Sequence, residues 1–407
     1  KMALITASSK QAFIEQLQVR LQDLVPRGDH SAVAQFCSQF FGIATLAELE
    51  VRQDADLLGC TLSAWRFVQQ MPGGDVKLRV FNPDTEQHGW QSTHSIVEVL
   101  HRDLPFLVDS VRMELTRQGY AIHNLYNSIV HVERDQSGNL KKLLAPGAQA
   151  ADARAESVMY IEIDRATNAS DLNALQKGLL AALDTVRATV QDFSAMRERV
   201  QALISQLNSR RKQYFSRDER AEAVAFLEWL LDDHFTFLGY ECFAINEGLP
   251  EQRLGLRTDA SLGALALNPR DENLEGLPDT VTAYLQAPLL LSFAKASQLS
   301  RVHRPAYPDY VSVREVDADG NVLLEHRFMG LYTSRVYSAL VDHIPHVRRK
   351  VAYVREVSGF IPRSHLAKEL EQVLQVLPRD DLFQTPVDEL AQTPIAIVQM
   401  QERNQIR

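Results

Sequence analysis

The stretch SIVEVLHRDLPFLVDS, residues 95–110, decides the fold predicted for this chain. Residues 95–100 are rich in β-branched side chains and predict a buried strand. Pro105 suits the first turn of a helix, because its missing N–H would have no partner there, and Gly119 marks the end of that helix. The apolar face of the predicted helix consists of Leu107, Val111 and Leu115.

Beyond this helix the chain predicts two more strands and a second helix. Residues 121–133 predict a long strand, residues 135–139 supply a turn, and residues 157–163 predict the returning strand. The second helix follows from an apolar stripe at helical spacing: Leu172, Leu175, Leu179, Leu183 and Val186. A last strand is expected near residues 186–190. This β-α-β-β-α order predicts a ferredoxin-like antiparallel sheet with both helices on one face.

The regions on either side predict helices and a second mixed domain. The first eighty residues have a mostly helical pattern that ends at Pro72-Gly73-Gly74, and alternation at residues 76–80 then predicts a strand. Four more strand candidates are residues 289–293, 300–303, 310–316 and 322–329. Residues 317–321 predict a hairpin between the last two of these strands.

We therefore predict an α+β multidomain chain with ferredoxin-like antiparallel sheets flanked by helical segments. The four expected segments are a helical segment at 1–82, a first ferredoxin-like domain with a trailing helix at 83–207, a second α+β domain at 208–345, and a helical segment at 346–407.

The composition is ordinary for a soluble globular protein. Of 407 residues, 45% are apolar and 23% are charged, which excludes disorder as the main property of the chain. A formal net charge of -9 repels phosphate groups, so we expect neither nucleic acid nor a membrane as a partner. No stretch approaches the roughly 20 apolar residues of a membrane span. The three cysteines, with no C-x-x-C pair, fit a reducing cytoplasm.

The sequence lacks the common motifs of catalytic and cofactor sites. It contains no glycine-rich dinucleotide or phosphate loop, no zinc-binding H-E-x-x-H and no G-x-S-x-G nucleophile elbow. His343 and His346 share a predicted helix face, but a metal site needs a third ligand and no candidate lies nearby in the sequence. We therefore expect no catalytic residue, bound cofactor or metal ion in this chain.

The strongest candidate for a functional site is the turn between the first strand and the first helix of the predicted sheet. A helix N-terminus there presents backbone N–H groups that favour a carboxylate, and Arg102 can add a charge-assisted hydrogen bond. The alternative is an ordinary capped turn in which Asp103 accepts from the helix N–H groups. The candidate effector or interface residues are Arg102, Asp103, Pro105, Phe106 and Asp109.

Several motifs resemble those of known proteins. Asp103-x-Pro105-x-Leu107, between a first strand and a first helix, resembles the ACT regulatory domain. Collinear motifs from about residue 15 to residue 407 resemble the N-terminal region of the large bacterial NAD-specific glutamate dehydrogenases. They include FNP at 81–83, PFLVDSV at 105–111, FLGY at 237–240, GLYTS at 330–334, RKV at 349–351 and PRDDLFQ at 378–384.

This resemblance implies ACT-like domains and helical segments in a very large cytoplasmic chain whose dehydrogenase domain lies downstream. The complete enzyme converts L-glutamate, NAD⁺ and water to 2-oxoglutarate, ammonia and NADH, so NAD is the cofactor of the full-length protein. We expect the present chain to stop before the catalytic domain and to be inactive by itself. Its expected roles are regulation, assembly of a homo-oligomer and contact with the downstream catalytic domain.

Position 106 departs from the ACT pattern. ACT domains that bind amino acids usually carry glycine directly after the proline, because the ligand approaches the backbone closely there; this chain has Phe106. The aromatic ring favours a purely structural scaffold, in which it fills the pocket or packs against another domain or subunit. Arg102 and Asp103 favour a sensor for an amino-acid effector. An independent enzyme is the third alternative, and the missing catalytic motifs count against it.

Overall fold

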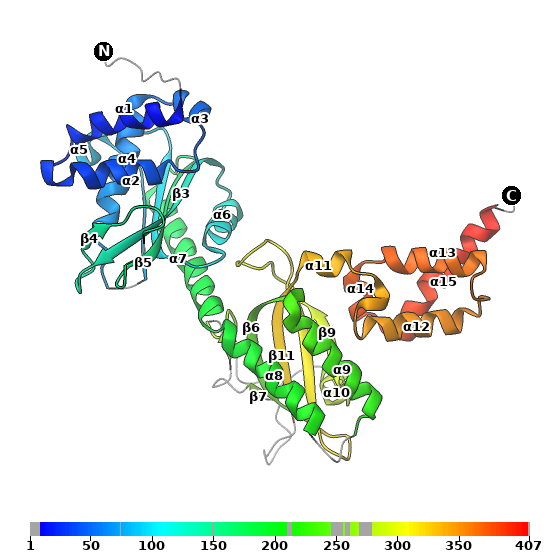
Figure 1. Ribbon diagram of the computed structural model, residues 1–407. Coiled ribbons are helices and arrows are strands. Elements are labelled where there is room, and N and C mark those ends of the chain that lie inside the picture. Colours follow the sequence, from blue (N-terminus) through cyan, green and yellow to red (C-terminus); the bar gives the residue numbers. More distant parts are fainter. Residues whose placement is uncertain are drawn as a thin grey trace. The chain divides into compact units, whose positions relative to one another are not determined.

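The computed structural model describes residues 9–73, 75–148, 150–209, 214–245, 255–256, 261–267 and 279–405. The chain forms two compact units (Figure 1). Unit 1 comprises Lys1–Val186 with Arg301–Arg304, and unit 2 comprises Arg187–Ser300 with Pro305–Arg407. Every strand pairing among the described residues is antiparallel. The predicted class, α+β with antiparallel sheets and flanking helical segments, is confirmed.

Unit 1 begins with a layer of helices, as the apolar spacing predicts. The helices are α1 (Lys10–Gln22), α2 (His30–Phe40), α3 (Leu46–Glu50) and α4 (Asp54–Val68), with the short α5 (Thr85–His88) after the first strand. Ser9 caps α1 by accepting from the N–H of Ala12, and Thr45 and Glu48 form a capping box on α3. These caps satisfy N–H groups that a helix start otherwise leaves without partners.

The sheet of unit 1 has the strand order β1-β2-β5-β3-β4. Its strands are β1 (Val76–Phe81), β2 (Ser95–Arg102), β3 (Ile122–Arg134), β4 (Leu140–Leu143) and β5 (Arg154–Ile163). Helix α6 (Leu107–Arg117) joins β2 to β3, and α7 (Ala169–Gln191) follows β5. Because β5 lies between β2 and β3, the predicted ferredoxin-like core is present.

The predicted last strand at residues 186–190 is wrong, because α7 continues through this region to Gln191. The helical stripe does not stop at Val186, which is fully buried. The edge of β2 that such a strand would pair with is taken by β1, which runs antiparallel to β2 from Val76 opposite His101 to Phe81 opposite Ile96.

Both faces of this sheet are covered. Ile96 and Leu100 of β2 pack into one core with the N-terminal helices. Val97 and Val99 point to the other face, where α6 and α7 lie, and are also fully buried (Figure 1). This arrangement explains why residues 95–100 are almost continuously apolar instead of alternating.

Unit 2 contains a second antiparallel sheet, in the order β7-β6-β11-β10-β9, with β8 paired to β6. Its strands are β6 (Phe235–Ala244), β7 (Gly255–Leu256), β8 (Leu262–Gly263), β9 (Leu291–Lys295), β10 (Asp309–Val316) and β11 (Val322–Tyr332). The predicted hairpin at 317–321 is confirmed, since the N–H of Asp317 donates to the carbonyl of Asn321 at 2.9 Å. The predicted strand at 300–303 is wrong: His303 has φ +72°, which a strand does not allow.

Helices precede and follow this second sheet. Before β6 come α8 (Phe193–Ser209), α9 (Arg217–Trp229) and a kinked segment, Leu230–His234, in which Asp232 and Asp233 have non-helical backbone angles; α10 (Asp279–Gln286) precedes β9. After β11 come α11 (Ser334–Ser338), α12 (Val347–Ser358), α13 (His365–Val376), α14 (Arg379–Gln384) and α15 (Val387–Gln405). In the part of the chain that the structure describes, no helix is both long enough and apolar enough to cross a membrane.

Gly59 in α4 allows Trp90 to pack against that helix. A Cβ added at Gly59 would lie 2.6 Å from the Trp90 ring. We predict that Gly59→Ala lowers the free energy of unfolding by about 1–3 kcal/mol, although alanine favours a helix by about 1 kcal/mol. Urea unfolding measures this loss. In the double variant Gly59→Ala/Trp90→Ala the clash is absent, so the losses should not add; fully additive losses would contradict the contact.

Candidate functional site

The turn between β2 and α6 is fixed by the strands on both sides of β2. The N–H of Arg102 donates to the carbonyl of Asp75 at 3.0 Å, just before β1. The N–H of Asp103 donates to the carbonyl of Ala155 in β5 at 2.9 Å. The sheet therefore determines where the chain leaves β2 and how it approaches α6.

The structure places the five candidate residues on this turn and on the first turn of α6. Arg102, Pro105 and Asp109 are exposed, whereas Asp103 and Phe106 are half-buried. Partial burial raises the pKa of Asp103, and the neighbouring imidazoles of His131 and His101 partly oppose that rise. His101 belongs to the stretch that predicts this turn, whereas His131 of β3 is a neighbour that sequence reasoning did not identify.

Helix α6 begins two residues later than predicted. Pro105 lies before the helix, and the N-cap residue is Phe106, whose side chain accepts no cap hydrogen bond. The alternative in which Asp103 caps the helix is therefore not realised. The physical reason is the backbone of Phe106, which has φ +71° and so cannot belong to a right-handed helix.

Phe106 keeps the left-handed backbone that glycine adopts without strain. A non-glycine residue in this conformation costs roughly 1–2 kcal/mol. The ring of Phe106 lies 4.8 Å, centroid to centroid, from the ring of His303. His303 belongs to the short segment that groups with unit 1, and burial lowers its pKa. Because the sequence pattern predicts a strand at 300–303, it gives no indication of this contact.

The face of the sheet that carries the N-terminal helices holds three buried carboxylates. Glu98, Glu156 and Glu162 are 1%, 0% and 2% exposed. Each carboxylate has a guanidinium partner: Arg79 for Glu98, Arg134 and Arg154 for Glu156, and Arg52 for Glu162. All three are thus occupied by ion pairs, which suits a structural role better than acid–base chemistry.

Two of these carboxylates connect the helices to the sheet. Arg52, two residues after the end of α3, donates both to Glu162 and, at 2.9 Å, to the hydroxyl of Tyr126. Ser63 of α4 donates to Glu98 at 2.7 Å. Burial raises the pKa of Glu98 even though Arg79 and Ser63 act to lower it. The helical layer and the sheet consequently share one hydrogen-bond network.

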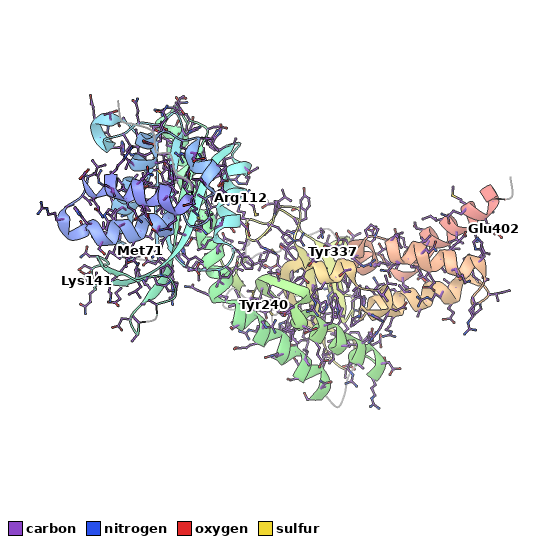
Figure 2. All side chains as sticks on the ribbon, turned by 45° about the horizontal axis from the view of Figure 1, so that its top comes forward. Met71, Arg112, Lys141, Tyr240, Tyr337 and Glu402 are labelled. Atoms are coloured by element: carbon purple, nitrogen blue, oxygen red, sulfur yellow. The ribbon has the colours of Figure 1, made fainter. Side chains whose placement is uncertain are left out.

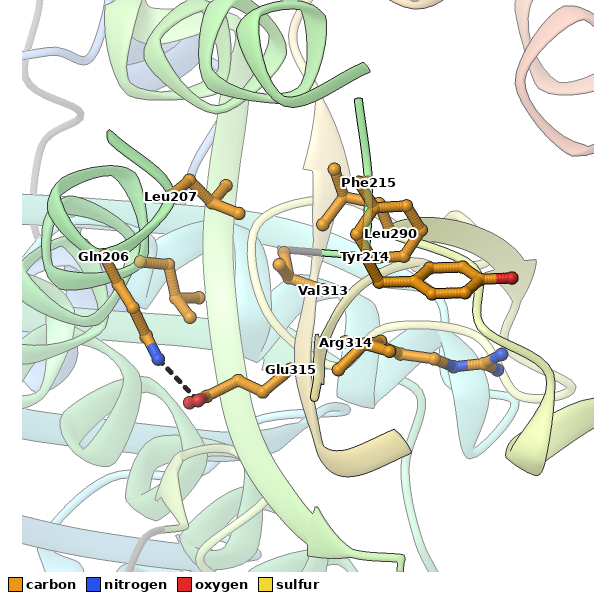
Figure 3. Close-up of a pocket in the computed structure, with 10 residues that line it drawn as sticks. Gln206, Leu207, Tyr214, Phe215, Leu290, Val313, Arg314 and Glu315 are labelled. Carbon is orange, nitrogen blue, oxygen red and sulfur yellow. Dashed lines mark hydrogen bonds between the residues drawn. The ribbon is translucent and has the colours of Figure 1, made fainter. Parts of the chain in front are cut away.

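A hydrogen-bonded row crosses the sheet of unit 2. The hydroxyl of Tyr240, labelled in Figure 2, lies 2.8 Å from Nδ1 of His326, and Nε2 of His326 lies 2.8 Å from Oε1 of Glu315. Gln206 of α8 donates to the other oxygen of Glu315, as the dashed line in Figure 3 shows. The cavity beside Gln206 and Glu315 has a volume of about 30 Å³, which suits water molecules better than an organic ligand.

Metal chemistry has no support among the residues that the structure describes, where no group of three or more suitable side chains meets. His346 is half-buried, with its ring 4.9 Å, centroid to centroid, from that of Phe293, while His343 is exposed. His343 ends a 3₁₀ turn at Val341–His343 and His346 is the N-cap residue of α12, so the two histidines do not lie on one face of a helix.

Comparisons with known proteins identify the family. A family profile described as "Glutamate dehydrogenase, ACT1 domain" matches residues 36–179, and one described as "Glutamate dehydrogenase, helical motif 1" matches residues 344–403. The chain is 51% identical over 411 residues to the NAD-specific glutamate dehydrogenase of Pseudomonas aeruginosa, an alignment that covers 100% of this chain and 25% of that protein. The chain belongs to the NAD-specific glutamate dehydrogenase family.

Two further relatives carry the same name. The Halomonas elongata protein is 40% identical over 402 residues, covering 97% of this chain and 25% of its own length. The Mycobacterium tuberculosis protein is 27% identical over 299 residues, covering 74% of this chain and 17% of its own. The chain thus spans about a quarter of the length of the first two glutamate dehydrogenases, and its matches to the ACT1 domain and helical motif 1 agree with the predicted N-terminal region.

The glutamate dehydrogenase motifs of unit 2 meet where the sheet joins the helical motif. A Cβ at Gly330 would lie 2.3 Å from the carbonyl oxygen of Thr236, so only glycine fits there. Two residues on, Tyr332 stacks on Phe383 with ring centroids 4.8 Å apart and an interplanar angle of 12°. The motifs at 330–334 and 378–384 therefore make one packing contact.

Lys350 secures the same junction. Its Nζ donates to three backbone carbonyls, those of Leu382 at 3.0 Å, Phe383 at 2.7 Å and Thr385 at 2.9 Å. Burial lowers the pKa of Lys350 to about 8. All three ammonium hydrogens are used, so this lysine has a structural role at the end of α14.

We predict that Phe106→Gly is about 1 kcal/mol more stable than Phe106→Ala. Both variants lose the ring and its contact with His303, but only glycine adopts φ +71° without strain. Urea unfolding of the two variants measures the difference. Equal stabilities would show that position 106 does not keep its left-handed backbone in solution.

We also predict a loss of stability at alkaline pH that depends on His326. Burial lowers its pKa, but hydrogen bonds to Cys242 and Glu315 outweigh burial and raise the pKa to about 9. Because the folded chain holds this proton more tightly than the unfolded chain, the stabilisation is complete below about pH 6.5 and is lost as the pH rises toward 9. The expected loss is at most about 3 kcal/mol.

Urea unfolding at pH 6, 7, 8 and 9 measures this dependence, with His326→Gln as the control. The variant should show a flatter profile across the same range. Parallel profiles for the two proteins would contradict a protonated His326.

Proposed function

We propose that this chain is the regulatory and oligomerisation region of a large NAD-dependent glutamate dehydrogenase. The complete polypeptide would oxidise L-glutamate with NAD⁺ and water to 2-oxoglutarate, ammonia and NADH, as a cytoplasmic homo-oligomer. The observation that carries the proposal is the match to the ACT1 domain over residues 36–179, together with 51% identity over the whole chain. The resemblance of the sequence motifs to that family implies that its ACT-like domains serve regulation and assembly.

We propose that this chain does not bind NAD itself. A dinucleotide cradle needs a glycine-rich turn from a strand into a helix of a parallel sheet. The sequence has no such motif, and all strand pairs among the described residues are antiparallel. We therefore assign NAD binding and the hydride transfer to a catalytic domain in the remainder of the polypeptide, and we propose that this chain has no activity of its own.

We further propose that the turn before α6 binds the carboxylate of an amino-acid effector. The support is geometric: α6 begins without a side-chain cap, and Arg102 is exposed at the end of β2. First-turn N–H groups and a guanidinium are the donors that a carboxylate prefers. An effector bound there would act on the distant catalytic site through its differential affinity for two conformations.

One observation favours the alternative, a scaffold that binds no small molecule. The half-buried ring of Phe106 already contacts His303 at the position where ligand-binding ACT domains usually have glycine. In that case the turn contributes packing, and regulation resides elsewhere in the polypeptide.

Calorimetric titration with a panel of L-amino acids separates the two functions. For a sensor, we expect saturable binding that weakens roughly 10- to 100-fold in Arg102→Ala, the loss of one charge-assisted hydrogen bond. Arg112→Ala is the matched control, since it removes an exposed arginine from α6 away from the turn and should bind as the parent does.

The other outcomes decide against parts of the proposal. Equal binding by parent and Arg102→Ala would place the effector site elsewhere, and no binding by folded protein would favour the scaffold. Micromolar binding of NAD⁺ to this chain would contradict its non-catalytic role.

A further inference from the structure

A groove runs along the helical motif of unit 2, between α12 and α15. Its volume is about 460 Å³. The residues that line it are Tyr353 and Val357 from α12 and Asp388, Ala391, Gln392, Ile395, Ala396 and Gln399 from α15. The family profile for helical motif 1 covers both helices but assigns no role to the groove.

The lining is largely apolar and remains accessible. Tyr353 and Val357 are spaced i, i+4 and are 37% and 45% exposed. On α15, Ala391 and Ala396 supply small side chains beside Ile395. Small residues in a groove let another helix approach closely, and apolar walls at helical spacing suit an amphipathic helix.

The groove also has a charge preference. Asp388 lies in the first turn of α15, at one end of the groove. Its carboxylate accepts a 2.5 Å hydrogen bond from the hydroxyl of Tyr353. Among the lining residues it is the one charged side chain, and none of the others is cationic. A basic side chain at one end of an incoming helix would therefore be complementary.

The groove fits the packing of its neighbours. Helices α12, α13 and α15 share one hydrophobic core, to which Val351, Leu374 and Val398 contribute. Helix α13 supplies no residue to the groove. Another helix laid along α12 and α15 would extend this helical core on its open side.

The size of the groove indicates that the occupant is tethered. Its α15 side, from Asp388 to Gln399, is three turns long, about 16 Å at 1.5 Å per residue. Stable association of separate chains typically buries 1,200 Å² or more, far more than so short a groove offers. A helix in the same polypeptide needs less contact, because its effective concentration is high.

We propose that the groove binds an amphipathic helix from the remainder of the glutamate dehydrogenase polypeptide, with an apolar i, i+3/i+4, i+7 stripe and a lysine or arginine near Asp388. The relatives of this chain are about four times as long as the part they share with it. The inference rests on one part of the proposed function, namely that the chain belongs to a longer dehydrogenase. It does not depend on an effector.

Thiol labelling of a cysteine placed in the groove tests the proposal. Cys37, Cys60 and Cys242 are all buried and free, so the background in this chain is low. Val357→Cys should react with a maleimide at least tenfold more slowly in the complete polypeptide than in the 407-residue chain, as followed by mass spectrometry of the peptide that contains it. Val376→Cys on α13, at a position 79% exposed, is the matched control and should react equally in both.

Each other outcome overturns the proposal in a distinguishable way. Equal rates for Val357→Cys in the two proteins would show that the groove is empty in the complete polypeptide. If the labelling of Val357→Cys in the 407-residue chain becomes slower as the protein concentration rises, the groove is occupied by a second copy of the chain. Ala396→Cys on the opposite wall repeats the test should Val357→Cys fold poorly. Absence of dehydrogenase activity from the complete polypeptide would defeat the proposed function without changing these labelling rates.

Discussion

Unit 1 depends on pairing the charged groups that its sheet buries. The ion pair between Arg134 and Glu156 shows this constraint. Two nitrogens of Arg134 donate to the two oxygens of Glu156, at 2.8 and 2.7 Å, and both side chains are almost completely buried. A sheet covered on both faces removes such groups from water, and a carboxylate left alone there would cost several kcal/mol. The same guanidinium also donates to the carbonyl of Val68 at the end of α4. The helical layer is thus bound to the sheet by hydrogen bonds that form only when α4 is correctly placed on the sheet.

Local signals in the sequence predict most elements of the fold but not how they pair. The apolar stripe of α7 and the change of period at β1 are properties of neighbouring residues, so they can be recognised without a structure. The edge of β2 is different, because either β1 or a strand after α7 could have occupied it. That choice depends on long-range pairing, and the continuing helix at Val186 decides it.

The candidate site could be predicted only in part, for the same reason. A strand end, a proline and a helix start identify the turn at Arg102 from sequence alone. Its neighbours His131 and His303 come from distant parts of the chain, so no spacing rule points to them. The sequence does contain a signal for Glu98, because it places a carboxylate inside a run of apolar residues. Its meaning appears only when β1 brings Arg79 opposite it.

The environment of Lys350 limits what evolution can do at this position. Three carbonyls converge on one nitrogen, which suits the tetrahedral ammonium of lysine. The guanidinium of arginine is planar and spreads its donors outward in a fork, so the usual conservative exchange would leave carbonyls without a donor. Acetylation would neutralise the nitrogen and remove two of its hydrogens, with the same result. The position should therefore tolerate neither drift to arginine nor modification, unlike the exposed arginines beside it on α12.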